Sequence, residues 1–376
     1  MRLVATLMVR DEADIVRPVL DNLFQQGVDT VIVTDNGSVD GTVEILESFG
    51  DRIDLRHDPV QRKQQFSVVT GMARDAATVH GADWVINADA DEFWLPKAGG
   101  ATVREVFEQL PTSLRTFTVD VVDMIGDPAE RGSGLDRLVL RDTRSLARMN
   151  EIGLHAHATP DAVHIGTPHI EVSQGNHFVN LVQQGDVPEG LGIEVLHYPW
   201  RSWEQFRSKV EKAGLAYDSN PELQPSPNHH GMREYRRLRA GTLFPYYVIR
   251  HPDAAERATG AADGTLVEDR RIADRFASPV ADKPLGKTRE AAAREYGTAI
   301  ARSDDEWRAM VGAKDARIDE LLHIVDEAKH RIDGLLDDVR AGEEREKAVR
   351  DELQLTRSRR VVRLADTVGR ALHRGR

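Results

Sequence analysis

The sequence predicts an α/β protein that is built on a doubly wound parallel sheet and followed by a helical extension. Two observations carry this prediction. Short apolar segments alternate with helical patterns from the first residues onward, which is typical of parallel strands joined by crossover helices. From about residue 304 the pattern changes to a seven-residue apolar repeat, which is typical of a coiled coil.

The sheet is expected to begin with four strands. They are the apolar or β-branched segments Leu3 to Val9, Thr30 to Thr34, Ile53 to Arg56 and Trp84 to Ile86. Asp14 can cap the helix after the first strand, and Gly27 closes that helix. Asp40 can cap the helix after the second strand, and a longer helix is expected over roughly Gln61 to Val79. Strands and helices therefore alternate throughout this part of the chain.

The fourth strand runs directly into two carboxylates, Asp89 and Asp91. Because right-handed crossovers place the ends of the first, second and fourth strands on one rim, Asp35 faces the same crevice. Two converging carboxylates repel each other unless a cation joins them. Hard oxygen ligands favour Mg²⁺ or Mn²⁺, which hold substrate phosphates. The alternatives are a solvated acidic loop for the pair and a turn residue for Asp35.

Nucleotide recognition is the chemistry expected at this rim. Asp35 can accept hydrogen bonds from a base or a ribose hydroxyl, while a metal on the two carboxylates neutralises a diphosphate. Arg10, Lys63 and Arg74 are candidates for further positive charge at the donor, and Asp89 belongs to the same donor-binding set. Solvated helix positions are the alternative interpretation of Lys63 and Arg74.

At these residues the chain resembles the family 2 glycosyltransferases of the GT-A fold. The matching stretches are Val9-Arg10-Asp11-Glu12, the loop from Asp35 to Thr42, and Asp89-Ala90-Asp91. A subgroup with an Asp-Ala-Asp-Glu-Phe motif is suggested by Asp89 to Phe93 together with Leu196 to Ser202. The resemblance covers about residues 1–250. It implies a nucleotide-sugar donor, a divalent cation on the Asp-x-Asp pair, and Asp35 at the position that contacts the nucleoside.

The resemblance has several departures. Asn36 stands where many family members carry a second acid. The Glu-Asp dipeptide that usually supplies the catalytic base is absent between residues 95 and 250, and so is the usual Gln-x-x-Arg-Trp segment. The donor-binding residues are therefore carried over from the family, whereas the catalytic base is not.

We expect a catalytic domain over residues 1–250, with a nucleotide-sugar-binding half at 1–95 and an acceptor-side half at 96–250. Short β-like segments broken by glycines predict mixed or antiparallel strands in the second half. These segments are Thr116 to Val122, Leu138 to Leu140, Val163 to Ile165, His169 to Val172 and Phe178 to Val182.

The acceptor-side half also contains candidate ligands. His197 follows an apolar segment and is a candidate metal ligand, since a late histidine can complete the metal shell in GT-A enzymes. His177 lies in a tight polar turn and is a candidate for contact with the acceptor. Trp94 and Trp200 are candidates for stacking on a sugar ring, with core or surface packing as an equal alternative.

An inverting transfer needs a base that deprotonates the acceptor hydroxyl, and a carboxylate is the usual choice in this family. Glu171 and Glu194 are the acids nearest the expected acceptor-side strand ends, and Glu92 is adjacent to the metal pair. Glu171 is the first candidate for the catalytic residue.

The composition narrows the class of protein. With 62 acidic and 50 basic side chains the net charge is -12, which argues against broad nucleic-acid binding. Because the chain has no cysteine, disulfides and thiolate metal sites are excluded. The sequence shows neither a signal-like N-terminus nor an apolar segment of the ~20 residues that span a bilayer. We therefore expect a cytoplasmic protein.

Residues 251–303 are expected to form a linker or loosely helical extension, and residues 304–355 a coiled coil. The predicted seam is the seven-residue repeat Val311, Ile318, Val325, Ile332 and Val339. β-Branched residues at one core position favour two parallel strands, so a dimer is expected, either a homodimer or one with a different chain. The alternative is a single amphipathic helix that packs on the catalytic domain.

Residues 356–376 are expected to form a basic amphipathic tail. Its charged residues are Arg357, Arg359, Arg360, Arg363, Arg370, Arg374 and Arg376, opposed by Asp366 alone among the acids. Such a helix is typical of peripheral contact with an anionic membrane surface, here the inner face of the cell membrane. The alternative is a disordered basic end.

The sequence-based hypothesis is a metal-dependent, inverting glycosyltransferase. It would move a sugar from a nucleotide-sugar donor to a cell-envelope or surface glycan, or to a lipid-linked acceptor, with Mn²⁺ or Mg²⁺ as cofactor. A nucleotidyltransferase that makes sugar nucleotides is the first alternative, but it predicts a glycine-rich loop that Arg10 to Asp14 lacks. The second alternative is an interaction protein with a degenerate transferase domain on a coiled coil.

Overall fold

The computed structural model describes residues 1–58, 65–111, 113–218 and 230–374. These residues form two compact units, Met1–Asp305 and Glu306–Arg376. The first unit contains the sheet and its covering helices, and the second is entirely helical apart from the break between its two helices.

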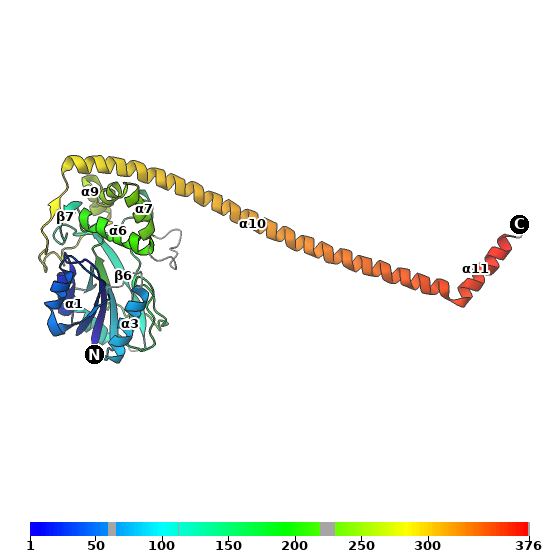
Figure 1. The fold of residues 1–376 in the computed structure, drawn as a ribbon, viewed down its shortest axis with the longest axis horizontal. Helices are drawn as coiled ribbons and strands as arrows, with labels where there is room; N and C mark the ends of the chain where they lie inside the picture. The colour runs from blue at the N-terminus through cyan, green and yellow to red at the C-terminus, as the bar shows by residue number, and fades with distance from the viewer. Residues whose placement is uncertain (59–64, 112, 219–229, 375–376) are drawn as a thin grey trace. The chain divides into compact units, whose positions relative to one another are not determined.

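The N-terminal part of the first unit alternates strands and helices, as the sequence predicts (Figure 1). Its strands are β1 (Leu3–Val9), β2 (Thr30–Asp35), β3 (Ile53–His57) and β4 (Trp84–Asp89). Its helices are α1 (Val16–Gln25), α2 (Thr42–Glu47) and α3 (Gln65–Thr78), with a 3₁₀ turn at Gly50–Arg52. The strand order is β4-β1-β2-β3, and each neighbouring pair is parallel. The four strands expected from the apolar segments are therefore confirmed.

Apolar side chains alternate between the two faces of β1, because successive residues of a strand point to opposite sides. Leu3 and Leu7 pack with the apolar residues of α1 in one cluster, whereas Val4 packs with those of α3 in another. Helices therefore cover both faces of the sheet, with α1 on one side and α3 on the other (Figure 1). This is the predicted doubly wound arrangement.

The second half of the sheet mixes strand directions, as expected. Its strands are β5 (Glu92–Pro96), β6 (Thr116–Ile125), β8 (Leu140–Asp142), β9 (Asp161–Ile165), β10 (Ile193–His197) and β11 (Leu266–Glu268). A separate two-stranded sheet pairs β7 (Ala129–Arg131) with β12 (Lys283–Pro284). β9 pairs antiparallel with both β4 and β6. β10 pairs antiparallel with β5 and parallel with β6, so that His197 lies opposite Glu92 on one side and Asp123 on the other.

Two expected strands, at 169–172 and 178–182, are reduced to an isolated bridge between Val172 and Val179. The backbone N–H of Glu171 donates to the side chain of Asn180 at 2.9 Å instead of to a strand partner. A side-chain acceptor of this kind competes with a ladder hydrogen bond. The segment is therefore a loop beside the sheet.

Helices complete the first unit. They are α4 (Val103–Gln109), α5 (Leu146–Glu151), α6 (Trp203–Asp218), α7 (His230–Arg239), α8 (Leu243–Arg250), α9 (Ala254–Asp263) and the start of α10 (Lys287–Ser358). An aromatic cluster with Phe206, Tyr235 and Tyr247 joins α6, α7 and α8. Leu266 and Leu285 are buried in the same cluster, so residues after 251 contribute to the core of this unit.

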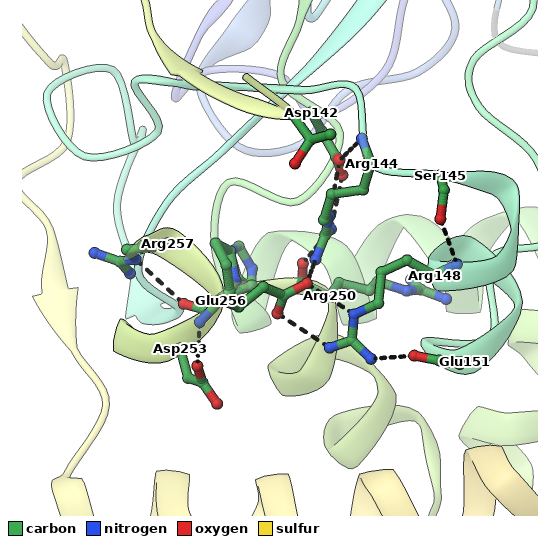
Figure 2. A network of polar contacts seen from close by, with 12 residues as sticks. Asp142, Arg144, Ser145, Arg148, Glu151, Arg250, Asp253, Glu256 and Arg257 are labelled. Carbon is green, nitrogen blue, oxygen red and sulfur yellow. Dashed lines mark hydrogen bonds and ion pairs between the residues drawn. The ribbon is translucent and has the colours of Figure 1, made fainter. Parts of the chain in front are cut away.

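A network of ion pairs fixes α9 to the β8–α5 segment (Figure 2). Arg144 contacts Asp142 and Glu256, each at 2.7 Å, and it also donates to the carbonyl of Arg250 at 2.9 Å. Arg148 on α5 reaches the same Glu256 at 2.8 Å. Because the side chain of Arg144 is only 3% exposed, loss of one partner would leave a buried charge uncompensated. The network is therefore structural.

The second unit consists of the later part of α10 and of α11 (Arg360–His373). None of its described residues, 306–374, is buried. The expected seam residues Val311, Ile318 and Val325 are 46%, 53% and 49% exposed. Within the described part of the chain, no helix combines the length and apolarity that crossing a bilayer requires.

Candidate active site

Asp91, in the turn between β4 and β5, is the centre of the site. The residue is only 1% exposed. Its Oδ2 accepts a hydrogen bond from Lys209 Nζ at 2.7 Å and lies 3.4 Å from a terminal nitrogen of Arg201, while its Oδ1 lies 3.7 Å from His197 Nε2. Burial opposes ionisation of Asp91, but Lys209, His197 and Arg201 outweigh it and hold its pKa well below the usual range. Asp91 is therefore an ionised carboxylate that already attracts cations.

His197, at the end of β10, is held in one orientation by a second carboxylate. Its Nδ1 lies 2.7 Å from Asp123 Oδ1, which leaves Nε2 directed toward Asp91. Burial works against a charged ring, but Asp91 and Asp123 prevail and raise the pKa of His197 well above its usual value. A histidine oriented by a carboxylate through one nitrogen is a common arrangement among metal ligands.

Asp89, at the end of β4, lies in a different environment. Its Oδ1 accepts a hydrogen bond from Asn176 Nδ2 at 2.9 Å, and its backbone N–H donates to Glu92 at 2.9 Å. Burial raises the pKa of Asp89 to about 6, and Asp91 and Asp161 add to this effect. Burial likewise raises the pKa of Glu92 well above its usual value, with Asp161 and Asp89 adding to it. This side of the site therefore holds carboxyl groups that bind protons readily.

Arg201 connects three segments of the chain. Its side chain is fully buried and contacts Glu12, Asp14 at 2.8 Å and Asp91. The guanidinium thereby joins the loop after β1, the β4–β5 turn and the loop before α6. Burial raises the pKa of Glu12 to about 7, although Arg201 and Lys209 act in the opposite direction.

A cleft of about 280 Å³ opens beside this network. Lys212 on α6 contacts Asp11 at 2.5 Å within its lining, and Arg10 lies 4.0 Å from the same carboxylate. The lining includes Arg10, Asp11, Glu12, Asp14, Asp40, Gln205, Ser208, Lys209 and Lys212. The lining therefore combines basic side chains with the acidic loop after β1, around a space large enough for a small ligand.

Asp35 lies at the end of β2, in register with Val9 at the end of β1. It is 4% exposed, and its carboxylate accepts the backbone N–H groups of Gly37 and Ser38, each at 3.1 Å. Asp35 therefore acts in part as a turn residue that bonds its own backbone. It also lies on the rim of the sheet, where the sequence predicts it. Arg74 on α3 donates to the carbonyl of Ile170 at 2.8 Å. Lys63 lies outside the described residues.

The remaining candidates are dispersed. Trp94 is fully buried in the main core, and Trp200 is 7% exposed, so burial favours the packing interpretation of both rings. Glu171 is exposed and lies 3.7 Å from Arg74. His177 lies 3.2 Å from Asp161 in the loop that also carries Asn176. Of the sequence candidates, the structure therefore brings together Asp89, Asp91 and His197, with His177 in the loop that contacts Asp89.

Arg201 and Lys209 are the cations that contact Asp91. Arg201 lies in the segment that resembles the family, but neither residue is among the candidate site residues of the sequence analysis. One signal could have found Lys209. Gln205, Ser208, Lys209 and Lys212 recur at the spacing of one helix face, and all four line the cleft.

Comparison with known protein families gives one match, which covers less than half of the chain. Residues 7–150 match the model of glycosyl transferase family 2. No curated protein sequence matches the chain. With the sheet described above, this match confirms the expected fold class, a GT-A-like sheet followed by a helical extension.

Distant likenesses to solved structures accompany this match. TarS 1-349 of S. aureus in complex with UDP is 10% identical, with 70% of this chain and 75% of that chain covered at a TM-score of 0.32. Glucosyl-3-phosphoglycerate synthase from Mycobacterium tuberculosis, in complex with Mn²⁺, UDP and glucosyl-3-phosphoglycerate, is 17% identical, with 44% and 56% covered at 0.23. Mannosyl-3-phosphoglycerate synthase from Rubrobacter xylanophilus is 18% identical, with 44% and 53% covered at 0.25. Likenesses this distant carry no information about donor or acceptor.

Proposed function

We propose that this protein is a metal-dependent, inverting glycosyltransferase that uses a nucleotide-sugar donor. The family match supports a glycosyltransferase. The single observation that carries the finer proposal is the environment of Asp91. Asp91, in the turn that follows the central strand β4, is buried, has a lowered pKa and contacts a cation, Lys209, at 2.7 Å. Ligands of open α/β sheets bind at this edge.

Asp91 and His197 are suited to hold a divalent cation together. Their facing oxygen and nitrogen are 3.7 Å apart, and Asp123 fixes the histidine through its other nitrogen. Among the described residues, no group of three His, Cys, Asp or Glu side chains is arranged to hold a metal ion. Phosphate oxygens of the donor would therefore complete the shell, together with Asp89 if it released Asn176. When bound, Mn²⁺ or Mg²⁺ would neutralise the diphosphate leaving group.

The donor would occupy the cleft beside the loop after β1. Arg10, Lys209 and Lys212 line this cleft, and Lys209 also contacts Asp91, so cationic groups are available to a diphosphate. Asp35, at the end of the neighbouring strand, would accept a hydrogen bond from the nucleoside. These residues bind and orient the donor, while the acceptor hydroxyl would approach from the side of Asn176 and His177.

The acceptor that we propose is a cell-envelope or surface glycan, or a lipid-linked precursor of one. The basic helix α11 supports this proposal, because it would bring an acidic catalytic unit to an anionic membrane surface. Transfer would then take place at the inner face of the cell membrane.

A screen with UDP-, GDP- and dTDP-sugars tests the proposal. Thermal shift in the presence and absence of Mn²⁺ would identify the donor, and release of nucleoside diphosphate would measure turnover. We expect Asp91→Asn to abolish metal-dependent nucleotide binding and to lower turnover by at least about 10²-fold. It should also lower the melting temperature, since Lys209 and Arg201 lose a buried counterion.

The exposed Asp120, which pairs with Lys97 on the same sheet, provides a matched control. Asp120→Asn should bind and turn over donor like the wild type. If no sugar nucleotide shifts the melting of the wild-type protein with either metal ion, the protein is not an active transferase. If Asp91→Asn retains metal-dependent binding, the metal site lies elsewhere.

A further inference from the structure

The loop Ser173–Phe178 carries polar side chains into the site. The backbone N–H of Ser173 donates to the carbonyl of Phe178 at 2.8 Å, which closes the loop. Gly175 and Asn176 both have positive φ, of 80° and 64°. The carbonyl of Asn176 accepts the N–H of Ala162 on β9 at 2.9 Å, while its side chain donates to Asp89. The loop is therefore anchored to a donor-side carboxylate and to a strand of the sheet.

The next residue of this loop, His177, forms a pair with a buried acid. Its Nδ1 lies 3.2 Å from Asp161 Oδ1, and Asp161 is only 2% exposed. Among the described residues, Oδ2 of Asp161 has no hydrogen-bond partner. An Nδ1–H that donates to Asp161 leaves the lone pair of Nε2 available to accept a proton.

The ring of His177 is held but remains accessible. Its side chain is 33% exposed, unlike that of Asp161. A Cβ atom at Gly175 would lie 2.7 Å from Nε2, so the ring edge rests against the one residue type that leaves room for it. Asp161 and Gly175 thus hold the imidazole of His177 in one orientation, at the edge of the carboxyl groups around Asp89.

We propose that His177 is the general base of the transfer and that Asp161 orients it. The inference rests on the proposed function. The acceptor O–H gives its proton to Nε2 of His177, and the acceptor oxygen forms a bond to the anomeric carbon of the donor. The bond from that carbon to the diphosphate breaks, and the nucleoside diphosphate leaves with the electron pair. Asp161 stabilises the imidazolium that results.

The carboxylates that could serve instead are engaged elsewhere. Glu171, the first candidate from the sequence, is exposed beside Arg74. Glu194 contacts Arg141 and Arg271 at 2.7 and 2.6 Å. Glu92 is only 4% exposed and already accepts the backbone N–H of Asp89 at 2.9 Å, so its carboxylate is occupied. His177 is therefore the candidate whose proton acceptor is oriented and reachable.

His177→Asn tests this role, because the amide Nδ2 of Asn can replace the Nδ1 donor to Asp161 while the proton acceptor is removed. With the donor found in the screen, we expect turnover to fall by about 10²- to 10⁴-fold. Binding of the corresponding nucleoside diphosphate with Mn²⁺ should be unchanged by calorimetry. His169→Asn changes an exposed histidine in the preceding segment and should have wild-type turnover.

Imidazole rescue separates a base from a structural residue. In His177→Ala, added imidazole should restore turnover in proportion to its concentration, whereas a loop that had merely lost a contact would not respond. Unchanged turnover in His177→Asn, or an absence of rescue in a His177→Ala protein that still binds nucleoside diphosphate, would overturn the assignment. If the wild-type protein turns over no donor at all, the proposed function fails instead.

Discussion

The two units of this chain treat their apolar residues in opposite ways. In Met1–Asp305, Leu, Ile and Val side chains fill contiguous buried clusters on both faces of a sheet. In Glu306–Arg376 the same residue types recur at regular helical spacing, yet none of the described residues is buried. A long helix with an exposed apolar stripe gains stability mainly when that stripe is covered.

This difference separates the unit that contains the core and the proposed active site from the unit that does not. The first unit has its own core, and it contains all of the carboxylates and cations of the proposed active site. The second unit contributes an apolar stripe and a basic end, which we propose serve assembly and membrane contact. We therefore expect changes in the two units to affect different measurements, and the predictions below test that separation.

Removal of the second unit should have the largest effect on assembly. The cut must follow Asp305, because Asp304 contacts Tyr246 and Arg237 of the first unit. We expect the full chain to sediment as a dimer and the protein ending at Asp305 as a monomer with the same turnover per chain. The matched substitution Ile332→Asp places a charge in the seam and should also dissociate the dimer. If all three proteins sedimented with the same number of chains per particle, the coiled-coil proposal would be contradicted.

Removal of the tail should abolish membrane binding. Each arginine near an anionic surface contributes about 1 kcal/mol, and the apolar residues Val361, Leu364 and Leu372 of α11 are all exposed. In co-sedimentation with vesicles of increasing anionic lipid content, the full chain should pellet and a protein ending at Leu355 should not. Binding should weaken with salt, since screening acts over about 10 Å at 0.1 M. Equal pelleting of both proteins would exclude the tail from membrane contact.

A substitution at Asp35 tests donor binding by the first unit. Asp35→Ala should weaken binding of the donor nucleotide by roughly 1.5–3 kcal/mol, the contribution of a hydrogen bond to a charged acceptor. Isothermal calorimetry on the full chain and on the protein ending at Asp305 should give the same loss. Because Asp35 also accepts two backbone N–H groups, the melting temperature of each variant must be recorded beside its affinity. Unchanged affinity would leave Asp35 as a turn residue.

The smallest predicted effect is a pH dependence of the folding stability of the first unit. Burial lowers the pKa of His164 to about 4 from 6.5, so the unfolded chain binds the proton more readily. Stability is therefore complete above pH 6.5 and is lost as the pH falls toward 4, by about 2 kcal/mol at pH 5.

The measurement compares melting at pH 7.5 and pH 5 in the wild type and in His164→Asn. The variant should lose less stability on acidification, because it has no imidazole to protonate. His323 and His330 of the second unit are 76% and 79% exposed, so substitution of either should leave the pH dependence unchanged. If acidification lowered the melting temperature of the wild type and of His164→Asn equally, His164 would not be the source of the pH dependence.

The sequence predicted the parallel part of the fold well, because β1, β2 and β4 each contain a run of apolar or β-branched residues. The shorter strand β3 alternates apolar and polar residues. The sequence-based prediction failed at 169–172 and 178–182, where Asn180 replaces a backbone partner and no strand forms. No local pattern reveals that competition. The position of a strand end is local information, which explains why Asp35 and Asp89 were placed on the rim.

The partners of the site residues were not predictable in the same way. Lys209 lies 118 positions from Asp91 along the chain, and Arg201 lies 189 from Glu12. Only the folded chain brings these charges together. The burial of Trp94 is similar, since its ring is enclosed by helices and strands distant in sequence. Burial and long-range ion pairs, rather than secondary structure, therefore limit what one sequence can predict.

The sharing of one guanidinium among Glu12, Asp14 and Asp91 has a genetic consequence. Substitutions at these positions alter the same charge balance, so their effects should be strongly epistatic. The stability lost when a second acid is removed should differ from the stability lost with the first, because it depends on whether Arg201 is still neutralised. Double-mutant cycles would reveal this coupling, and natural relatives should change the four residues as a set rather than one at a time.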